Sequence, residues 1–128
     1  CEARCAPPSA WNAASVSFSY QNQKGRVVFR IDRAPHTAVL ADRNPLFTGG
    51  DAHHARFNAR VSSDAPSFAH GRTGQNVLLA TGGVNWTVKP MIALPLQADA
   101  DNIWTARGVK TYTGTEAPAD EQDSFLVP

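Results

Sequence analysis

Alternation of apolar and polar residues predicts two β-strands near the N-terminus, at residues 15–21 and 26–32. In each run every second residue is apolar, which is the period of a strand with one buried face. Lys24 and Gly25 lie between the runs and offer a turn, so we expect the two strands to form a hairpin. The apolar side chains of these strands are predicted to lie in the core: Val16, Phe18, Tyr20, Val27, Phe29 and Ile31.

The strongest hairpin signal lies further along the chain, between residues 75 and 89. Strands at 75–80 and 84–89 flank Thr81-Gly82-Gly83, and glycine is the residue that tight hairpin loops favour. A shorter strand is predicted at 37–41, and it ends in a turn at 42–45 because Pro45 disfavours helix before it. The predicted core of the hairpin consists of Val77, Leu79, Val84, Trp86 and Val88.

The remaining segments show little periodicity. Residues 47–71 are predicted to form a long surface loop, and loops of this length often carry function. Residues 1–14 are predicted to form an N-terminal segment with a short helical turn around 9–14, for which Ser9 is the expected cap. Residues 98–128 form a loop-rich tail with short strands at 103–104 and 111–112. The chain as a whole, residues 1–128, is predicted to be a single, mainly β domain with an antiparallel sheet.

Composition excludes several classes of protein. The chain has 128 residues, 42% of them hydrophobic and 18% charged, with a net charge of +1. This is one ordinary domain that can bury a core. The balanced charge argues against a nucleic-acid binder. The longest apolar stretches, 77–80 and 91–96, fall far short of the roughly 20 residues of a membrane helix, so no membrane span is expected.

Two cysteines, Cys1 and Cys5, lie close together at the start of the chain. Three interpretations stay open: a local disulfide, two free thiols, or attachment of a metal or a lipid. Haem attachment is excluded because Ala6, and not histidine, follows Cys5. The absence of an initiator methionine fits a cleaved precursor, so we expect an exported protein at an extracellular, cell-surface or periplasmic location, where a disulfide persists.

Candidate chemistry is sparse. The four histidines, His36, His53, His54 and His70, lack the spacing of metal ligands, and no nucleophile motif accompanies them. We therefore expect neither catalysis nor a resident cofactor. The best cation candidate is a calcium site formed by Asp99, Asp101 and Asn102, since closely spaced oxygen ligands suit calcium. The alternative is an ordinary turn in which these side chains bond their own backbone.

One stretch resembles a known family. Residues 70–84 comprise a histidine, a spacer, an apolar Asn-Val-Leu strand and a glycine turn. This stretch resembles the signature of the pilin-like (pseudopilin) proteins of planctomycete bacteria. Residues 40–45 resemble the strand and turn that precede the family's histidine, and residues 101–104 and 123–128 resemble its C-terminal end. The motif positions that match are His70, Gly74, Asn76, Gly82 and Gly83.

The family has aspartate where this chain has Thr81, so the role of that aspartate is not carried over. Because a β-branched residue resists a positive φ, we expect the turn to become a bulged loop that Gly82 and Gly83 carry. His70 is expected to be a structural residue that fixes the loop before the hairpin.

The resemblance implies a β-rich head of a type IV pilin or type II secretion pseudopilin, or an α+β fold if the family's N-terminal apolar helix is counted. Such a head is exported and packs into a filament with copies of itself or with related subunits, without catalysis. The apolar helix has no counterpart in the sequence, so either it has been removed or the chain assembles by another route. In the first case, Cys1 marks a processing point near the former helix end.

Two other functions stay open. The first is a secreted module that binds carbohydrate or a surface partner, with Trp11 and Trp104 as stacking platforms and residues 47–71 as a polar loop. The second is a small hydrolase or metal site that uses His70 with Asp42 or His53.

Overall fold

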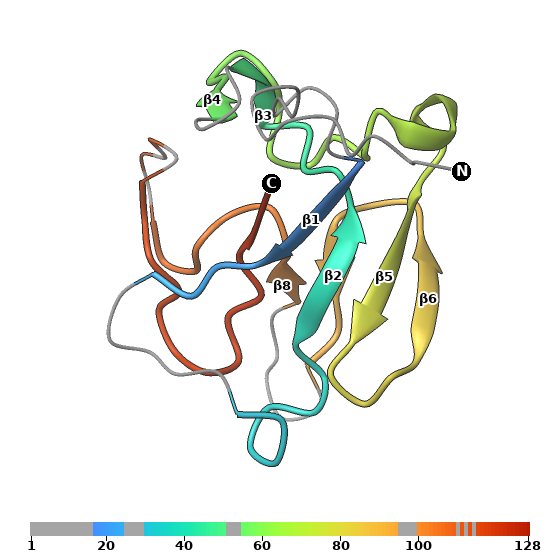
Figure 1. The fold of residues 1–128 in the computed structure, drawn as a ribbon, viewed down its shortest axis with the longest axis vertical. Coiled ribbons are helices and arrows are strands. Elements are labelled where there is room, and N and C mark those ends of the chain that lie inside the picture. Colours follow the sequence, from blue (N-terminus) through green and yellow to red (C-terminus); the bar gives the residue numbers. More distant parts are fainter. Residues whose placement is uncertain are drawn as a thin grey trace, which may run out of the picture.

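The computed structural model describes residues 17–24, 30–50, 55–94, 100–109, 111, 113 and 115–128. Its main element is an antiparallel sheet in the order β6-β5-β2-β1-β9 (Figure 1). Two small sheets pair β3 with β4 and β7 with β8, and a 3₁₀ helix, η3 (Ala69–Arg72), precedes β5. The strands are β1 (Phe18–Gln21), β2 (Ala38–Asp42), β3 (Phe47–Gly50), β4 (Ala55–Phe57), β5 (Gln75–Leu79), β6 (Val84–Thr87), β7 (Met91–Ile92), β8 (Asp101–Asn102) and β9 (Leu126–Val127).

The prediction of a mainly β chain with an antiparallel sheet is confirmed. The strand predicted at 37–41 is β2, in the centre of the sheet, and the predicted hairpin is β5 with β6. Its loop is Ala80-Thr81-Gly82, closed by hydrogen bonds from Gly82 N to Leu79 O and from Leu79 N to Gly83 O. Gly82 takes a φ of 89°. This is the bulged three-residue loop expected from the sequence, and it spares Thr81 the positive φ.

Other predicted elements were wrong. The predicted hairpin of residues 15–21 with 26–32 is not possible at Tyr20. This residue of β1 already pairs with β2 on one side and with β9 on the other, which leaves no edge for a third strand. Residues 31–33 form a turn, and residues 25–29 lie outside the described residues. Residues 47–71 are not one loop, since they contain β3, β4 and η3. In the tail, residues 103–104 form a turn after β8, and Thr111 is not in a strand.

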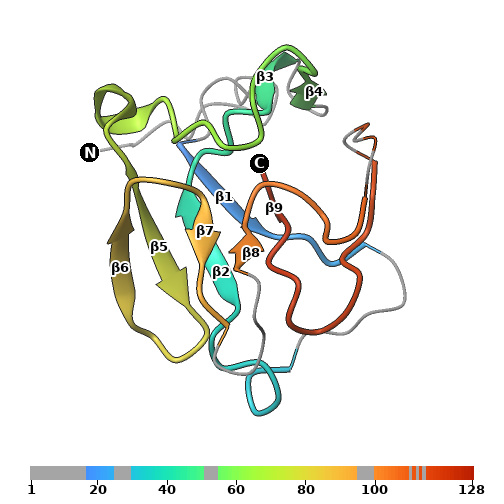
Figure 2. The same ribbon diagram turned by 180° about the vertical axis from the view of Figure 1, so that it is seen from behind.

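The core lies on one side of the five-stranded sheet. The view from behind shows β7, β8 and the C-terminal segments over this side (Figure 2). The sheet contributes mostly small side chains here, such as Ser19, Ala38 and Ala41, and the segments opposite contribute the large ones. The buried hydrophobic cluster consists of Ala38, Ala41, Leu46, Phe47, Val77, Ile92, Ile103, Trp104, Ala106, Phe125 and Leu126.

The opposite side of the sheet, the outer face, carries large apolar residues that solvent reaches. Tyr20 pairs with Leu40, Leu40 with Leu78, and Leu78 with Val84, so these four side chains form a row across the sheet. A second row runs from Phe18 through Asp42 and Asn76 to Trp86. We define the outer face by these eight residues. In Figure 1 no labelled element lies in front of β1 and β2 on this side.

The predicted core was therefore right for Val77, which is buried, and right in part for Leu79, which packs against the core cluster. It was wrong for most of the aromatic and β-branched residues, because alternation defines two faces of a strand without saying which one is covered. Val16, Val27 and Phe29 lie outside the described residues. The residues predicted to be buried but exposed are Phe18 (53%), Tyr20 (55%), Ile31 (59%), Val84 (64%), Trp86 (50%) and Val88 (66%).

A buried asparagine joins the sheet to the segments that cover it. Asn44 is fully buried, and its side-chain amide donates to the carbonyls of Leu126 (2.8 Å) and Trp104 (3.2 Å). Its side-chain oxygen accepts from Leu46 N at 2.9 Å, and its own N–H donates to Ser19 Oγ at 2.8 Å. One residue thus satisfies polar groups of β1, β9 and two loops that would otherwise be buried without partners.

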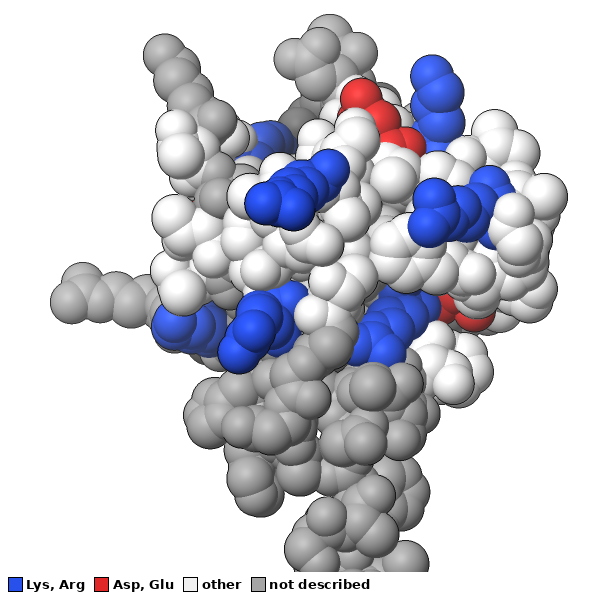
Figure 3. Space-filling model, turned by 90° about the horizontal axis from the view of Figure 1, so that it is seen from above, with Lys and Arg blue, Asp and Glu red and all other residues white. Residues whose placement is uncertain are grey.

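Among the described residues, no helix has the length and apolar content needed to cross a bilayer. Seen from above, Lys and Arg side chains occupy separate positions on the surface, with fewer Asp and Glu among them (Figure 3).

Replacing Asn44 is expected to destabilise the fold strongly. In Asn44→Ala, two buried carbonyls lose their donor, and an unsatisfied buried group costs about 1–3 kcal/mol, so we expect a loss of about 2–4 kcal/mol in the free energy of unfolding. Urea denaturation measures it. The matched control is Asn85→Ala at an exposed position of β6, expected to change stability by less than about 0.5 kcal/mol. Equal effects of the two substitutions would contradict the role assigned to Asn44.

Candidate functional site

Two of the motif residues, His70 and Asn76, lie together with Asp42 and Trp86 at one end of the outer face, whereas Gly82 and Gly83 lie in the loop at the other end of the β5–β6 hairpin. His70 Nε2 lies 3.2 Å from Asp42 Oδ2 and 3.3 Å from Asn76 Nδ2. Asn76 N donates to the same carboxylate oxygen at 2.7 Å. The His70 ring packs edge-on against Trp86, with 5.3 Å between ring centroids. We call these four residues, Asp42, His70, Asn76 and Trp86, the Asp42–His70 cluster.

The cluster is assembled from three strands and a strained turn. Asp42 ends β2, Asn76 lies in β5 and Trp86 in β6, while His70 comes from η3. His70, Gly71 and Arg72 have φ values of 51°, 64° and 64°. Two of these three residues are not glycine, so the left-handed turn is costly unless its surroundings stabilise it. Contacts of His70 to Asp42 and Trp86, and of Arg72 over the Phe68 ring at 4.5 Å, supply that stabilisation.

Burial differs within the pair. The Asp42 side chain is 7% exposed, whereas the His70 side chain is 46% exposed. His70 thus covers a carboxylate that also accepts a hydrogen bond from Asn76 N at the start of β5. Among the residues that the structure describes, no serine or cysteine side chain is hydrogen-bonded to His70. His53 and His54 lie outside the described residues.

Gly74 has a packing role that the sequence motif alone does not explain. A Cβ at this position would lie 2.6 Å from the Thr87 carbonyl oxygen and 2.7 Å from Trp86 Cζ2. Only glycine therefore lets the chain pass this close to β6 as it enters β5. Gly83, by contrast, has only Thr81 Oγ1 near such a Cβ, at 3.8 Å.

The predicted calcium ligands are occupied with internal hydrogen bonds where the structure describes them. Asp101 accepts from Ser124 N at 2.7 Å. Asn102 accepts from Trp104 N at 3.0 Å and donates to the Ser63 carbonyl at 3.1 Å, which is the ordinary turn considered as the alternative. Asp99 lies outside the described residues. Among the described residues no group of three or more His, Cys, Asp or Glu could hold a metal ion, and the calcium site stays a prediction.

Asp101 and Asp123 are two buried aspartates that no sequence pattern predicted to lie near each other. Asp123 accepts from Arg107 N at 2.9 Å and Ala119 N at 2.6 Å, and Asp101 lies close enough to raise its pKa by charge repulsion. Burial is the main reason that the pKa values of both Asp101 and Asp123 are raised above the usual range. Acidic residues are frequent near the end of the chain, but their spacing in the sequence does not indicate which of them is buried.

Trp11 and Trp104 were predicted to be stacking platforms for a ligand. Trp11 lies outside the described residues, as do Cys1 and Cys5. Trp104 is fully buried and its indole N–H donates to the Ala65 carbonyl at 3.0 Å, so its prediction as a binding platform was wrong. Trp104, which lies within a turn, is in the core, whereas Trp86, predicted to be buried, is half-exposed.

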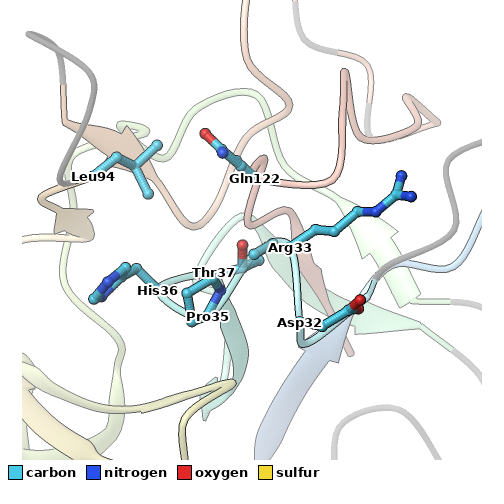
Figure 4. A pocket seen from close by; sticks show the side chains of 8 residues that line it. Asp32, Arg33, Pro35, His36, Thr37, Leu94 and Gln122 are labelled. Atoms are coloured by element: carbon cyan, nitrogen blue, oxygen red, sulfur yellow. The ribbon is translucent and has the colours of Figure 1, made fainter.

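A pocket of about 440 Å³ lies away from the Asp42–His70 cluster. The turn at 32–37 forms one side, and Leu94 and Gln122 lie across from it (Figure 4). Arg33 at its rim lies 3.6 Å from Glu121. The volume suits a small molecule, and no sequence pattern predicted this pocket.

Substitution of Gly74 tests the close packing of this region. In Gly74→Ala, the new methyl group meets the backbone of Thr87 and the Trp86 ring, and overpacking of this kind costs about 1–3 kcal/mol of unfolding free energy. The control Gly83→Ala has room and is expected to stay within about 0.5 kcal/mol of the wild type. Thermal and urea unfolding measure both. Equal stability of the two variants would refute the packing role.

Acid titration tests the buried aspartates. Because the pKa of Asp123 is raised in the folded state, only the folded state binds its proton at pH values between about 3.9, the unfolded value, and the higher folded value. Its contribution to stability is therefore largest below this window and is lost as pH rises through it. In Asp123→Asn the neutral amide oxygen still accepts from Arg107 N and Ala119 N without a buried charge.

The stability of Asp123→Asn relative to the wild type is thus expected to increase as pH rises from 4 to 7. Urea denaturation of both proteins at each pH gives this difference. A relative stability that falls over the same pH range would show that the carboxylate is favoured in the fold.

Comparison with protein-family models, with curated proteins and with solved structures finds no match to this chain. The features that bear on function are therefore its own: the Asp42–His70 cluster, the pocket beside residues 32–37, and the exposed apolar outer face.

Proposed function

We propose that the protein is a non-catalytic structural subunit, similar to a pseudopilin head, that assembles into an extracellular or cell-surface filament or secretion apparatus. The observation that carries the proposal is the outer face. Phe18 and Tyr20 of β1 and Trp86 of β6 are each half-exposed on the same side of one sheet, with Leu40 and Leu78 between them. Clustered exposed apolar side chains of this kind mark interaction sites in soluble proteins.

The Asp42–His70 cluster supports the same proposal. Its hydrogen bonds join the end of β2 to the start of β5 and position Trp86 beside His70. These contacts explain two of the matched motif residues, His70 and Asn76, as parts of a scaffold, so no reaction is needed to account for them. The motif then serves to hold the surface of the outer face in shape, which is what an assembling subunit requires.

A carbohydrate-binding module is the second candidate, and Trp86 is the observation that favours it. Its ring is half-exposed and held edge-on by His70, and aromatic rings presented in this way stack on sugars. A change of tryptophan fluorescence with added glycans, in a protein that stays monomeric, would favour this candidate over assembly.

Sedimentation velocity of the full chain over a concentration series tests assembly, with electron microscopy of the concentrated sample. We expect concentration-dependent association. Phe18→Ser with Tyr20→Ser is expected to weaken it at least about tenfold, because a buried aromatic side chain contributes about 1.5–3 kcal/mol. Ile31→Ser, an exposed apolar position in the turn at 31–33, is the control and leaves association unchanged. A chain that is monomeric at every concentration would refute the proposed function.

A further inference from the structure

We propose that a second copy of this chain pairs with the free edge of β6, antiparallel and in a register centred on Trp86. The inference rests on the proposed function, because it names one of the contacts through which assembling subunits meet, in addition to the outer face. The paired segment is residues 84–88, which comprise β6 and the residue after it.

The first argument is that β6 has an unpaired edge. It is the last strand in the sheet order, and among the described residues it pairs only with β5 (Figures 1 and 2). The hydrogen bond from Leu79 N to Gly83 O sets the alternation of the antiparallel ladder. The backbone groups of Asn85 and Thr87 therefore point toward β5, and those of Val84, Trp86 and Val88 point outward.

The second argument is that residues 84–88 lack the charged residues and prolines that protect many edge strands in monomeric proteins. Residues 84–88 contain no charge, no proline and no glycine, and valine, tryptophan and threonine all favour strands. Val84 and Val88 are about two-thirds exposed, and Trp86 is half-exposed. An open, apolar edge with outward-pointing N–H and C=O groups is a template for another strand.

The third argument identifies the other strand as a copy of the same segment. In a register centred on Trp86, Val84 faces Val88 of the second copy, and the two Trp86 side chains face each other. These are also the residues with outward backbone groups, so each pair forms ladder hydrogen bonds. On the other side of the sheet, Asn85 faces Thr87. Lys89 would face Gly83, so no like charges meet.

This pairing also extends the outer face. Trp86 belongs to the second row, which the second copy continues across the two-fold axis, and Val84 at the end of the first row meets Val88 of the second copy. The two five-stranded sheets become one sheet with both outer faces on the same side, and the contact is of the isologous type that a two-fold axis generates.

Charge placed at the facing pair tests the register. In Val84→Lys with Val88→Lys, each lysine faces a lysine of the other copy, and we expect association to weaken at least about tenfold. In Val84→Lys with Val88→Glu, each lysine faces a glutamate, and association is expected to return to within about threefold of the wild type. Sedimentation velocity of the full chain measures association, and circular dichroism with thermal unfolding verifies that each variant folds.

The matched control is Ile31→Lys with Val109→Lys, which adds the same charge at exposed apolar positions outside residues 84–88. It is expected to associate like the wild type. A lysine–glutamate variant that stays as weak as the double-lysine variant would overturn the register.

Association of the double-lysine variant at wild-type strength would overturn the β6 contact and leave the proposed function standing. A wild type that remains monomeric at every concentration would overturn both, leaving this edge to a strand of a different protein.

A cysteine pair gives a second readout that does not depend on repulsion. With Cys1 and Cys5 replaced by serine, a mixture of Val84→Cys and Val88→Cys chains is expected to form a disulfide-linked dimer under mild oxidation. Facing residues of an antiparallel pair lie about 5.5 Å apart at Cα, within disulfide reach. Either variant alone is expected to stay unlinked, and efficient linking of Val84→Cys with itself would contradict the register.

Discussion

The buried side chain of Asn44 is the interaction on which the rest of the structure depends. The sheet contributes small side chains to the core, those of Ser19, Ala38 and Ala41. The large side chains of the core therefore come mostly from the segments that cover the sheet. These segments bring backbone carbonyls into the core, and Asn44 satisfies two of them, from Trp104 in the turn after β8 and from Leu126 in β9. Since unsatisfied buried carbonyls are costly, the large apolar residues can be buried only while this asparagine holds its place.

The same arrangement explains the exposed outer face. Small residues on the inner side of β1 and β2 leave room for Trp104, Ile103 and Phe125, which fill the core from the other side. The large residues of the strands then point the other way, where no described segment buries them. An apolar sheet face beside β6, an edge strand that among the described residues pairs only with β5, is consistent with the proposed assembly.

Much of the sheet was predictable because local chemistry determines it. The β5–β6 hairpin follows from its alternation and from Gly82, which takes the one positive φ of the loop. The orientation of the strands was not predictable, because alternation in Phe18 and Tyr20 is the same whichever side is covered. Likewise, the contact of His70 with Asp42 joins residues far apart in sequence, and it was anticipated only as one alternative. The close approach that requires Gly74 arises from tertiary packing, which no local pattern contains.

Hydrogen exchange of the β6 amides, measured at several protein concentrations, tests the central claim most directly. The account predicts that Asn85 and Thr87, bonded to β5, exchange slowly at every concentration. Val84, Trp86 and Val88, whose amides point outward, exchange fast in dilute solution and slow down as the protein associates. Fast exchange at these three positions in the associated state would contradict it, because the subunits would then meet elsewhere.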